Sequence, residues 1–308
     1  MKDILVTIFG GGGFLGRNVV QELLAQGARV RVAERNPGKA LRVKPLAGLG
    51  QIQLLSADIT RAESVARAVD GADVVINLVG ILKGDFDRVH VTGAQNVAQA
   101  AAAAGAKALV QVSAIGADSH SPSAYGRSKA AGEAAVLAAF PTATIIRPSI
   151  MFGREDQFTN RFAGMIRMAP LVPVIAGKTK FQPVYVVDVA RAIAAAALSP
   201  ATHGGRTFEL GGPQVMSMAQ INSWLAAVTG HGRAFLPVPG AVAGILAALP
   251  GAPLTRDQWR MLQRDNVVAQ GAEGFSAFGI APTPMAAVAE QWLVQYRRHG
   301  RFAGRAQA

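Results

Sequence analysis

The sequence predicts an α/β protein in which a doubly wound parallel sheet is followed by a smaller C-terminal lobe. Short apolar runs alternate with amphipathic or alanine-rich stretches through the first 150 residues, which is the rhythm of strand–helix–strand units. The first run, "DILVTIF" from Asp3 to Phe9, is apolar with little interruption and ends in glycines, as a strand buried on both faces does. After Gly153 this rhythm changes to segments rich in proline, glycine and aromatic residues, which indicates the second lobe.

Each element of the larger part is recognised by its residue types and by the residues that end it. Apolar and β-branched residues mark the strands, and alanine-rich or amphipathic stretches mark the helices between them. Gly27 ends the first helix, because glycine readily adopts the left-handed conformation that closes a helix. In chain order, strands are expected at 3–9, 29–35, 52–59, 73–80, 108–116 and 142–153, and helices at 17–27, 62–72, 91–106 and 129–140.

The domain organisation is expected to be discontinuous. Residues 1–150 form the parallel-sheet domain, and residues 182–198 ("QPVYVVDVARAIAAAAL") return to it with one more strand and helix. Residues 151–181 and 199–308 are expected to make up a smaller lobe that serves a substrate or a partner. A chain of 308 residues is long enough for one sizeable core and such an appended lobe.

The composition excludes several classes of protein. The chain has no cysteine, which excludes disulfides, thiolate metal sites and cysteine nucleophiles, and its five histidines show no ligand spacing, so no metal site is expected. No uncharged apolar run free of proline reaches the roughly 20 residues that a membrane-spanning helix needs. A strand begins almost at Met1, which leaves no room for a targeting segment. We therefore expect a cytoplasmic protein with no transmembrane helix.

The formal net charge is +12, which is compatible with nucleic acid, anionic lipid or phosphorylated cofactors as partners. A basic tail from Tyr296 to Arg305 contains Phe302, but elsewhere the basic residues are not interleaved with aromatic residues in any stripe. Because such interleaving is typical of nucleic-acid-binding surfaces, we expect no nucleic-acid partner.

The stretch "IFGGGGFLG", from Ile8 to Gly16, has glycines at GxxGxxG spacing directly after the first strand and at the start of the first helix. These glycines allow a tight turn, a close approach of the backbone to a pyrophosphate and close packing of helix on strand. The helix N-terminus adds free N–H groups and a partial positive charge. The motif therefore indicates a dinucleotide site, to which we assign Gly10, Gly13, Phe14 and Leu15.

The end of the second strand bears on which dinucleotide binds. An acidic residue there can bond the ribose hydroxyls of NAD, whereas an arginine can hold the 2′-phosphate of NADP. Arg35 favours NADP(H), because Glu34 is expected to point to the opposite side of the alternating strand, and NAD(H) stays possible. Further cofactor contacts are expected after the third and fourth strands, at Asp58, Ile59, Leu78, Val79 and Gly80.

The stretch "SAYGRSK", from Ser123 to Lys129, has a tyrosine and a lysine on one face of a helix. A lysine ammonium beside a phenol lowers the pKa of the phenol and prepares it to exchange a proton with a substrate hydroxyl or carbonyl. The same lysine can hydrogen-bond the ribose of a nicotinamide cofactor. Tyr125 and Lys129 are therefore candidates for catalysis and for holding the cofactor, and both roles stay open.

The glycine loop followed by "YGRSK" resembles the signature of the short-chain dehydrogenase/reductase superfamily, specifically its extended branch with a Rossmann domain. This resemblance implies a third catalytic hydroxyl just beyond the fifth strand. Ser113 is the only hydroxyl there, one or two positions before the usual site, where Ala114 and Ile115 stand. Ser121 or Ser123 could replace it from the loop, and the stretch "RNP" after Glu34 resembles the strand ending of NADP-binding members.

Four further segments, Phe152–Ala163, Gln182–Ala190, Thr255–Val268 and Gly279–Met285, are similar to the nucleotide-binding alpha subcomplex subunit nine family of respiratory complex I. This family is grouped with atypical short-chain dehydrogenases. The resemblance implies a tightly held NADPH, regarded as structural in the family, and a role near the membrane-bound quinone machinery or in ubiquinone biosynthesis. Carried over to this chain, the cofactor contacts are Gly10, Gly13, Phe14, Arg35, Asp58, Tyr125, Lys129 and Pro148.

Two hypotheses about function stay open at this point. The first is a nucleotide-holding accessory protein of a respiratory or quinone-synthesis complex, from a bacterial relative of the family, located in the cytoplasm or peripherally on the inner membrane. The second is an NADP(H)-dependent oxidoreductase or epimerase acting on a nucleotide sugar, an isoprenoid or a quinone precursor. The uncharged stretch Phe235–Leu254 is expected to be either lobe core or an apolar surface for a membrane or partner, and Arg154 of "GRED" to pair with Glu155 or Asp156.

Overall fold

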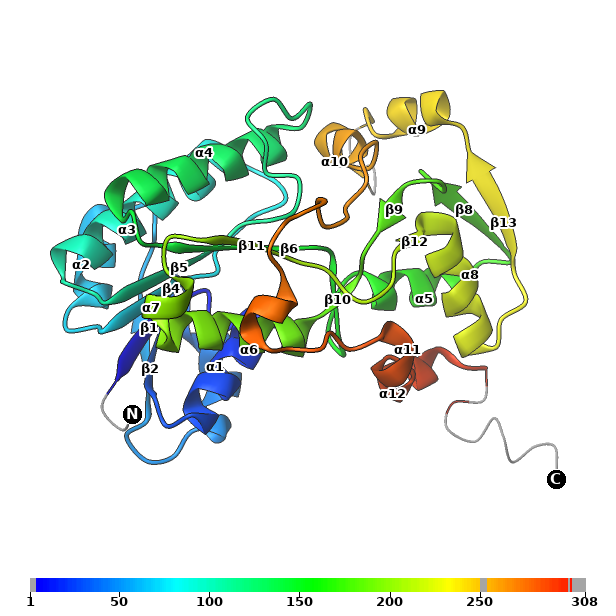
Figure 1. The fold of residues 1–308 in the computed structure, drawn as a ribbon. Coiled ribbons are helices and arrows are strands. Elements are labelled where there is room, and N and C mark those ends of the chain that lie inside the picture. The colour runs from blue at the N-terminus through cyan, green and yellow to red at the C-terminus, as the bar shows by residue number, and fades with distance from the viewer. Residues whose placement is uncertain (1–3, 250–253, 299, 301–308) are drawn as a thin grey trace. The chain divides into compact units, whose positions relative to one another are not determined.

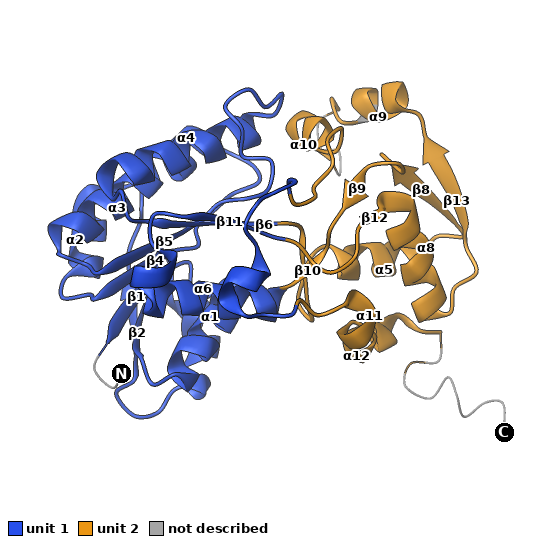
Figure 2. Ribbon diagram, in the orientation of Figure 1, with its two compact units in different colours: residues 1–148, 186–210, 269–281 blue, residues 149–185, 211–268, 282–308 orange. Residues whose placement is uncertain are grey.

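The computed structural model of the protein describes residues 4–249, 254–298 and 300. The chain divides into two compact units, which have different colours in Figure 2. Unit 1 comprises residues 1–148, 186–210 and 269–281, and unit 2 comprises residues 149–185, 211–268 and 282–308.

Unit 1 is built on a seven-stranded sheet with the strand order β11-β6-β5-β4-β1-β2-β3. All neighbouring strands pair in parallel, and β1 lies between β2 and β4. Both faces of the sheet are covered, so its central strands are largely apolar. Every residue of β4 and of β5 is buried. The strands are β1 (Leu5–Phe9), β2 (Arg29–Glu34), β3 (Ile52–Ser56), β4 (Val74–Asn77), β5 (Ala108–Val112), β6 (Thr144–Pro148) and β11 (Thr207–Leu210).

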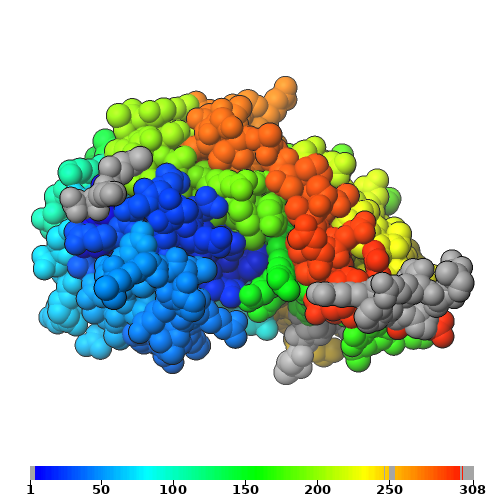
Figure 3. Space-filling view, turned by 90° about the horizontal axis from the view of Figure 1, so that it is seen from below, coloured from blue at the N-terminus to red at the C-terminus, as the bar shows by residue number. Residues whose placement is uncertain are grey.

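Helices cover both faces of this sheet (Figure 1). On one face α2 packs on α3 and α3 on α4, and on the other α1 packs against α6, which Figure 3 shows as neighbouring blue and yellow-green surfaces. The doubly wound parallel α/β fold predicted from the sequence is therefore confirmed. The helices are α1 (Phe14–Ala25), α2 (Ala62–Val69), α3 (Ala94–Ala103), α4 (Ala124–Ala139), α6 (Val186–Leu198) and α7 (Pro200–His203), with 3-10 turns η1 (Pro37–Leu46) and η3 (Phe275–Phe278) and the π-helical turn η2 (Asp87–Gly93).

Part of the stretch 199–308, which is expected from the sequence to belong to the smaller lobe, lies in unit 1. Strand β11 instead pairs with β6, so that Phe208 lies opposite Ile146, and residues 269–281 also belong to unit 1. An ion-pair cluster holds this edge: the Arg147 guanidinium lies 2.6 Å from Glu133 Oε2 of α4 and 3.3 Å from Glu209 Oε1 of β11. These pairings join segments far apart in the chain, so no local pattern indicates them.

The described residues of unit 2 form three small two-stranded sheets and short helices around a second apolar core. Phe152, Phe181, Leu225 and Trp292 are among its buried side chains. The paired strands are β7 (Met151–Phe152) with β10 (Val184–Tyr185), β8 (Leu171–Ile175) with β13 (Ala234–Val238), and β9 (Lys180–Phe181) with β12 (Met216–Ser217). The helices are α5 (Thr159–Met168), α8 (Met218–Thr229), α9 (Gly240–Leu246), α10 (Arg256–Met261), α11 (Met285–Val288) and α12 (Glu290–Leu293), followed by the 3-10 turn η4 (Val294–Tyr296).

The uncharged stretch 235–254 is partly core and partly surface. On α9 and just after it, Ala243 and Ala247 are buried, while Val242, Ile245 and Leu249 are about half exposed. Residues 250–253 of this stretch, and most of the basic tail that starts at Tyr296, lie outside the described residues. No helix in the described part of the chain has the length and apolar character needed to span a bilayer.

Candidate cofactor and active site

The glycine loop forms a tight turn between β1 and α1. Gly10 has a left-handed φ of 84°, which glycine adopts without strain, and the Gly13 N–H donates to the Gly10 carbonyl oxygen at 3.1 Å. A Cβ on Gly16 would overlap that same carbonyl oxygen and would lie 2.6 Å from Gly11 Cα. The third glycine is therefore required for helix α1 to approach the turn. The first N–H groups of α1 point out of the helix end, where they can bind an anion.

A cavity of about 290 Å³ opens beside this loop in unit 1. Eight of the residues that line it are assigned to the cofactor from the sequence, and eight are not. The first group is Gly10, Gly13, Arg35, Asp58, Ile59, Leu78, Val79 and Gly80; the second is Gly12, Ala33, Glu34, Lys39, Ala57, Thr60, Ile81 and Val89.

The orientation of Glu34 corrects an expectation from the sequence. Its side chain does not point away from the loop, because Glu34 Oε1 accepts a hydrogen bond from the Gly12 N–H at 2.8 Å. Strand β2 ends at Glu34, so the alternation of a regular strand does not fix this side chain, and the free N–H of the loop attracts the carboxylate. Arg35 and Lys39 line the same cavity. Lys39 was missed, although "RNPGK" places this second cation one turn beyond Arg35.

Asp58 is held by its own turn at the end of β3. Its Oδ1 accepts from both the N–H and the hydroxyl of Thr60, each at 2.9 Å. Burial acts to raise the pKa of the Asp58 carboxyl, but these bonds and the charges of Arg35 and Arg88 outweigh it, so the pKa is lowered. The Asp58 carboxylate is thus charged and fixed at the rim of the cavity.

The residues of "YGRSK" lie in the first turns of α4. The Ser123 hydroxyl caps this helix by accepting from the Gly126 N–H at 2.9 Å, and a Cβ on Gly126 would overlap the Ser121 hydroxyl. The Ser121 hydroxyl accepts from the Ser123 N–H at 3.3 Å, so both serines proposed as replacements for Ser113 are engaged at the start of α4. Tyr125 and Lys129 follow on one face, with the Lys129 ammonium 5.9 Å from the centre of the tyrosine ring.

The pKa values of Tyr125 and Lys129 differ from those expected if the lysine lowered the pKa of the phenol. Burial raises the pKa of the Tyr125 phenol to about 12. Burial also lowers the pKa of Lys129 to about 8, against the opposing attraction of Glu133. Lys129 Nζ donates to the Val112 carbonyl oxygen at 3.4 Å and would lie 3.2 Å from a Cβ on Gly80, so it touches the cavity wall. In this arrangement Tyr125 is a protonated phenol at neutral pH.

The remaining predicted residues lie at the ends of the central strands or at the start of α1. Ser113 follows β5 and is buried, and its hydroxyl has no hydrogen-bond partner among the described residues. Pro148 ends β6, and its carbonyl oxygen accepts from the Ile115 N–H at 3.1 Å. Phe14 is half-buried and Leu15 is buried, and neither is among the residues that line the cavity. No group of three histidine, aspartate or glutamate side chains suited to a metal ion occurs in the described residues.

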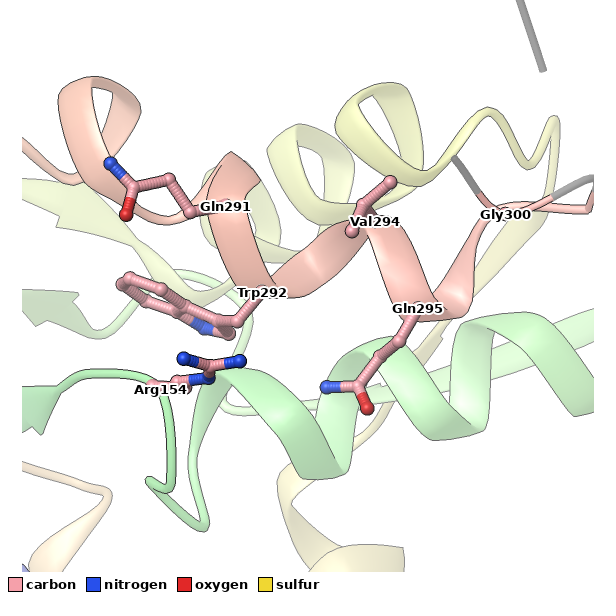
Figure 4. Close-up of a pocket in the computed structure, with 6 residues that line it drawn as sticks. All are labelled: Arg154, Gln291, Trp292, Val294, Gln295 and Gly300. Atoms are coloured by element: carbon pink, nitrogen blue, oxygen red, sulfur yellow. The ribbon is translucent and has the colours of Figure 1, made fainter. Parts of the chain in front are cut away.

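In the "GRED" stretch, the Asp156 carboxylate bonds groups at the start of a helix. The Asp156 carboxylate lies just before α5 and accepts from the Gly153 and Phe158 N–H groups at 2.8 Å, from the Asn160 N–H at 3.2 Å and from the Thr159 hydroxyl at 2.6 Å. Arg154 lines a separate cavity of about 310 Å³ in unit 2, shown in Figure 4, where its guanidinium lies beside the indole of Trp292. A carboxylate within reach of several free N–H groups bonds them in preference to an exposed arginine.

The residues at the cavity of unit 1 fit a dinucleotide. The glycine cradle leaves backbone N–H groups accessible at the start of α1, which suits a pyrophosphate. Arg35 and Lys39 line the cavity and supply two cations beyond the end of β2. The Ser113 hydroxyl, which has no hydrogen-bond partner among the described residues, follows β5, and the Tyr125–Lys129 pair lies on α4.

Comparison with known proteins gives a consistent result. Residues 6–211 match the model of the NAD dependent epimerase/dehydratase family. The chain is 34% identical, over 97% of its length and 80% of the relative, to NADH dehydrogenase [ubiquinone] 1 alpha subcomplex subunit 9, mitochondrial, from Arabidopsis thaliana. It is 34% identical, over 64% of its length and 62% of the relative, to the ceramide reductase of Caulobacter vibrioides.

Solved structures agree on the fold. The NADPH-dependent quinone oxidoreductase QOR2 of Escherichia coli, in its complex with NADPH, superposes with a TM-score of 0.75. The match covers 94% of this chain and 99% of the other, at 21% identity. At this identity the likeness establishes a shared fold and nothing more.

Proposed function

The chain belongs to the NAD dependent epimerase/dehydratase family and groups within it with the subunit 9 proteins of mitochondrial NADH dehydrogenase, and from this premise we propose that it is an NADP(H)-binding accessory protein of the respiratory chain or of ubiquinone metabolism. Its cofactor stabilises the fold, and the protein works in the cytoplasm, peripherally on a membrane complex. The observation that carries the proposal is the extent of the similarity. The family model ends at residue 211, whereas the likeness to the subunit 9 protein spans 97% of the chain and so includes most of unit 2.

The choice of NADP(H) rests on the charges at the cavity. Arg35 and Lys39 both line it, and one carboxylate oxygen of Glu34 is already bonded to the Gly12 N–H. The 2′-phosphate of NADP(H) is an anion that two cations attract, whereas NAD(H) has only a hydroxyl at this position. The arrangement therefore favours the phosphorylated dinucleotide.

Calorimetric titration with NADPH and NADH tests this choice. We expect the wild-type protein to bind NADPH at least about tenfold more tightly than NADH, a difference of about 1.4 kcal/mol. Arg35→Ser should remove this preference by weakening NADPH alone, while Arg42→Ser, on the 3-10 turn η1 that follows Arg35 but outside the cavity lining, should leave it intact. Equal affinity of the wild-type protein for the two nucleotides would contradict the proposal for NADP(H).

The accessory role is tested by purification from membranes. The tagged protein, extracted with a mild detergent from its native cells, should co-purify with respiratory or quinone-synthesis proteins and with a retained nucleotide, both identified by native mass spectrometry. A protein recovered alone, with NADPH that exchanges within seconds and is consumed with a carbonyl substrate, would refute a structural role for the cofactor.

A second candidate function is an NADP(H)-dependent reductase, and the geometry of Tyr125 favours it. A nicotinamide cofactor supplies hydride chemistry, and the Tyr125 phenol, whose pKa burial raises to about 12, is protonated at neutral pH. A protonated phenol can donate its proton to a carbonyl oxygen of a substrate, and the Lys129 ammonium favours the phenolate that is left. One relative is named a ceramide reductase and another a 2-alkyl-3-oxoalkanoate reductase.

Turnover separates the two candidates. Under this second function, NADPH oxidation with a nucleotide sugar, an isoprenoid ketone or a quinone precursor is abolished in Tyr125→Phe, which leaves NADPH affinity within about threefold of wild type because only one hydroxyl is lost. Activity that survives this change would exclude Tyr125 as the proton donor.

A further inference from the structure

A buried histidine joins the wall of the cofactor cavity to helix α4. His90 lies in the middle of the π-helical turn η2 and is 3% exposed. π-helical turns are rare and frequently occur at functional sites. Neither the sequence patterns nor the proposed function assigns a role to this residue.

The two nitrogens of the His90 ring contact different parts of unit 1. Nε2 lies 3.0 Å from the Ile81 backbone nitrogen, whose N–H donates to it, and Ile81 is part of the cavity lining. Nδ1 lies 2.9 Å from the Ser128 hydroxyl, and that hydroxyl donates to the Tyr125 carbonyl oxygen at 2.8 Å. Because a backbone N–H can only donate, Nε2 carries no proton and the neutral ring holds its proton on Nδ1.

The surroundings keep the ring neutral and fixed in place. Burial, and after it the charge of Lys129, lowers the pKa of His90 to about 3. The Phe86 ring stacks on the imidazole at 5.5 Å between centroids, and the Tyr125 ring meets its edge at 5.4 Å. The His90 carbonyl oxygen approaches α4 so closely that a Cβ on Gly132 would overlap it.

The loop after β4 is therefore held between η2 and α4. A Cβ on Gly80 would lie 3.2 Å from Lys129 Nζ and 3.7 Å from His90 Nε2, so both side chains touch this stretch of backbone. Gly80 and Ile81 are cavity residues, whereas Tyr125 and Lys129 belong to α4. His90 is the side chain that hydrogen-bonds to both sides.

We propose that His90 is a positioning residue: as the Nδ1–H tautomer it holds the Gly80–Ile81 wall of the cofactor cavity in register with the Tyr125–Lys129 face of α4. The proposal rests on dinucleotide binding at this cavity. Through His90 the position of the cavity wall and the position of the Tyr125–Lys129 pair are fixed by one ring.

Substitutions at His90 test the proposal by calorimetric titration with NADPH. His90→Leu removes both bonds and should weaken NADPH binding about tenfold, the change that loss of one buried hydrogen bond produces. His90→Gln can place its carbonyl oxygen near the position of Nε2 and accept from Ile81, so it should stay within about threefold of wild type. His90→Asn is too short to reach Ile81 and should behave like His90→Leu.

His203 offers a matched control. It is also a buried histidine of unit 1, 6% exposed, with ring nitrogens at 3.1 Å from the Ser199 carbonyl oxygen and 3.3 Å from that of Ala277. It does not line the cavity. His203→Leu should lower the thermal midpoint as much as His90→Leu does but leave NADPH affinity unchanged. A merely structural role for His90 predicts instead that affinity follows thermal stability in all four variants.

The tautomer is tested without any ligand. In a long-range ¹H–¹⁵N spectrum of the ¹⁵N-labelled protein, His90 should show protonated Nδ1 and unprotonated Nε2, and addition of NADPH should shift the signals of His90 and leave those of His203 in place. A protonated Nε2, or equal NADPH affinity of folded His90→Leu, His90→Asn and wild-type protein, overturns the proposal. Failure of wild-type protein to bind NADPH would instead refute the proposed function. The tautomer measurement would still test whether His90 accepts from the Ile81 N–H and donates to Ser128.

Discussion

Replacing Lys129 with methionine should stabilise the cofactor-free protein at neutral pH. Lys129 is 6% exposed, and burial lowers its pKa from 10.5 to about 8. Each pKa unit corresponds to about 1.4 kcal/mol, so the charged lysine costs the folded state on the order of 3 kcal/mol below pH 8. Methionine has a similar length and no charge, so Lys129→Met removes this cost.

The pH dependence gives this prediction its sign. The folded pKa lies below the unfolded one, so between pH 8 and 10.5 the unfolded chain binds more protons and the free energy of unfolding of wild type rises with pH. Below pH 8 both states are protonated and the full cost is present. In Lys129→Met this contribution is absent at every pH.

Urea unfolding followed by circular dichroism measures the effect. The advantage of Lys129→Met over wild type should be constant from pH 6 to 7 and should shrink by on the order of 2 kcal/mol between pH 8 and 9.5. All other titrating groups are common to the two proteins, so their contributions cancel in the difference. If the difference in unfolding free energy between Lys129→Met and wild type stays constant from pH 8 to 9.5, Lys129 does not carry a charge that is destabilised by burial.

Three further changes probe other contacts of the fold by urea unfolding. Gly16→Ala should destabilise the protein by more than about 2 kcal/mol and abolish NADPH binding, because the new Cβ would overlap the Gly10 carbonyl oxygen. Arg147→Gln should cost about 3 kcal/mol, since it leaves the buried carboxylates of α4 and β11 without their shared cation. Asp156→Ala should cost about 1 to 2 kcal/mol, because the Gly153, Phe158 and Asn160 N–H groups at and just before the start of α5 lose their acceptor.

Each of these changes has a control elsewhere in the chain. Gly48→Ala meets only the Gln51 side chain at 3.5 Å and should be nearly neutral, so a similar loss at both glycines would contradict the crowding at Gly16. Arg206→Gln removes a solvent-exposed pair with Glu273, which water screens, and should cost far less stability than Arg147→Gln. For Asp156, the variant Asp156→Asn keeps an acceptor and should recover about half of the loss.

The sequence by itself determined the parts of this protein that depend on neighbouring residues. The strand–helix alternation, the glycine turn at Gly10 and the helical spacing of Tyr125 and Lys129 are all local, because backbone preferences and periodicity act over a few residues. Parallel strands also bring their carboxyl ends to one edge, which is why Arg35, Asp58 and Gly80 could be predicted to share a cavity.

Only the tertiary structure decided which distant groups meet. The pairing of β11 with β6, the bond from Gly12 to Glu34 and the link from Ile81 through His90 to α4 join residues whose separation in the chain leaves no periodic signal. Polar groups that fold into the interior bond the nearest available partner, and that partner is set by how the helices pack. For this reason Asp156 bonds N–H groups at the start of α5, Glu34 bonds the loop, and His90, which belongs to no motif, links the cavity wall to α4.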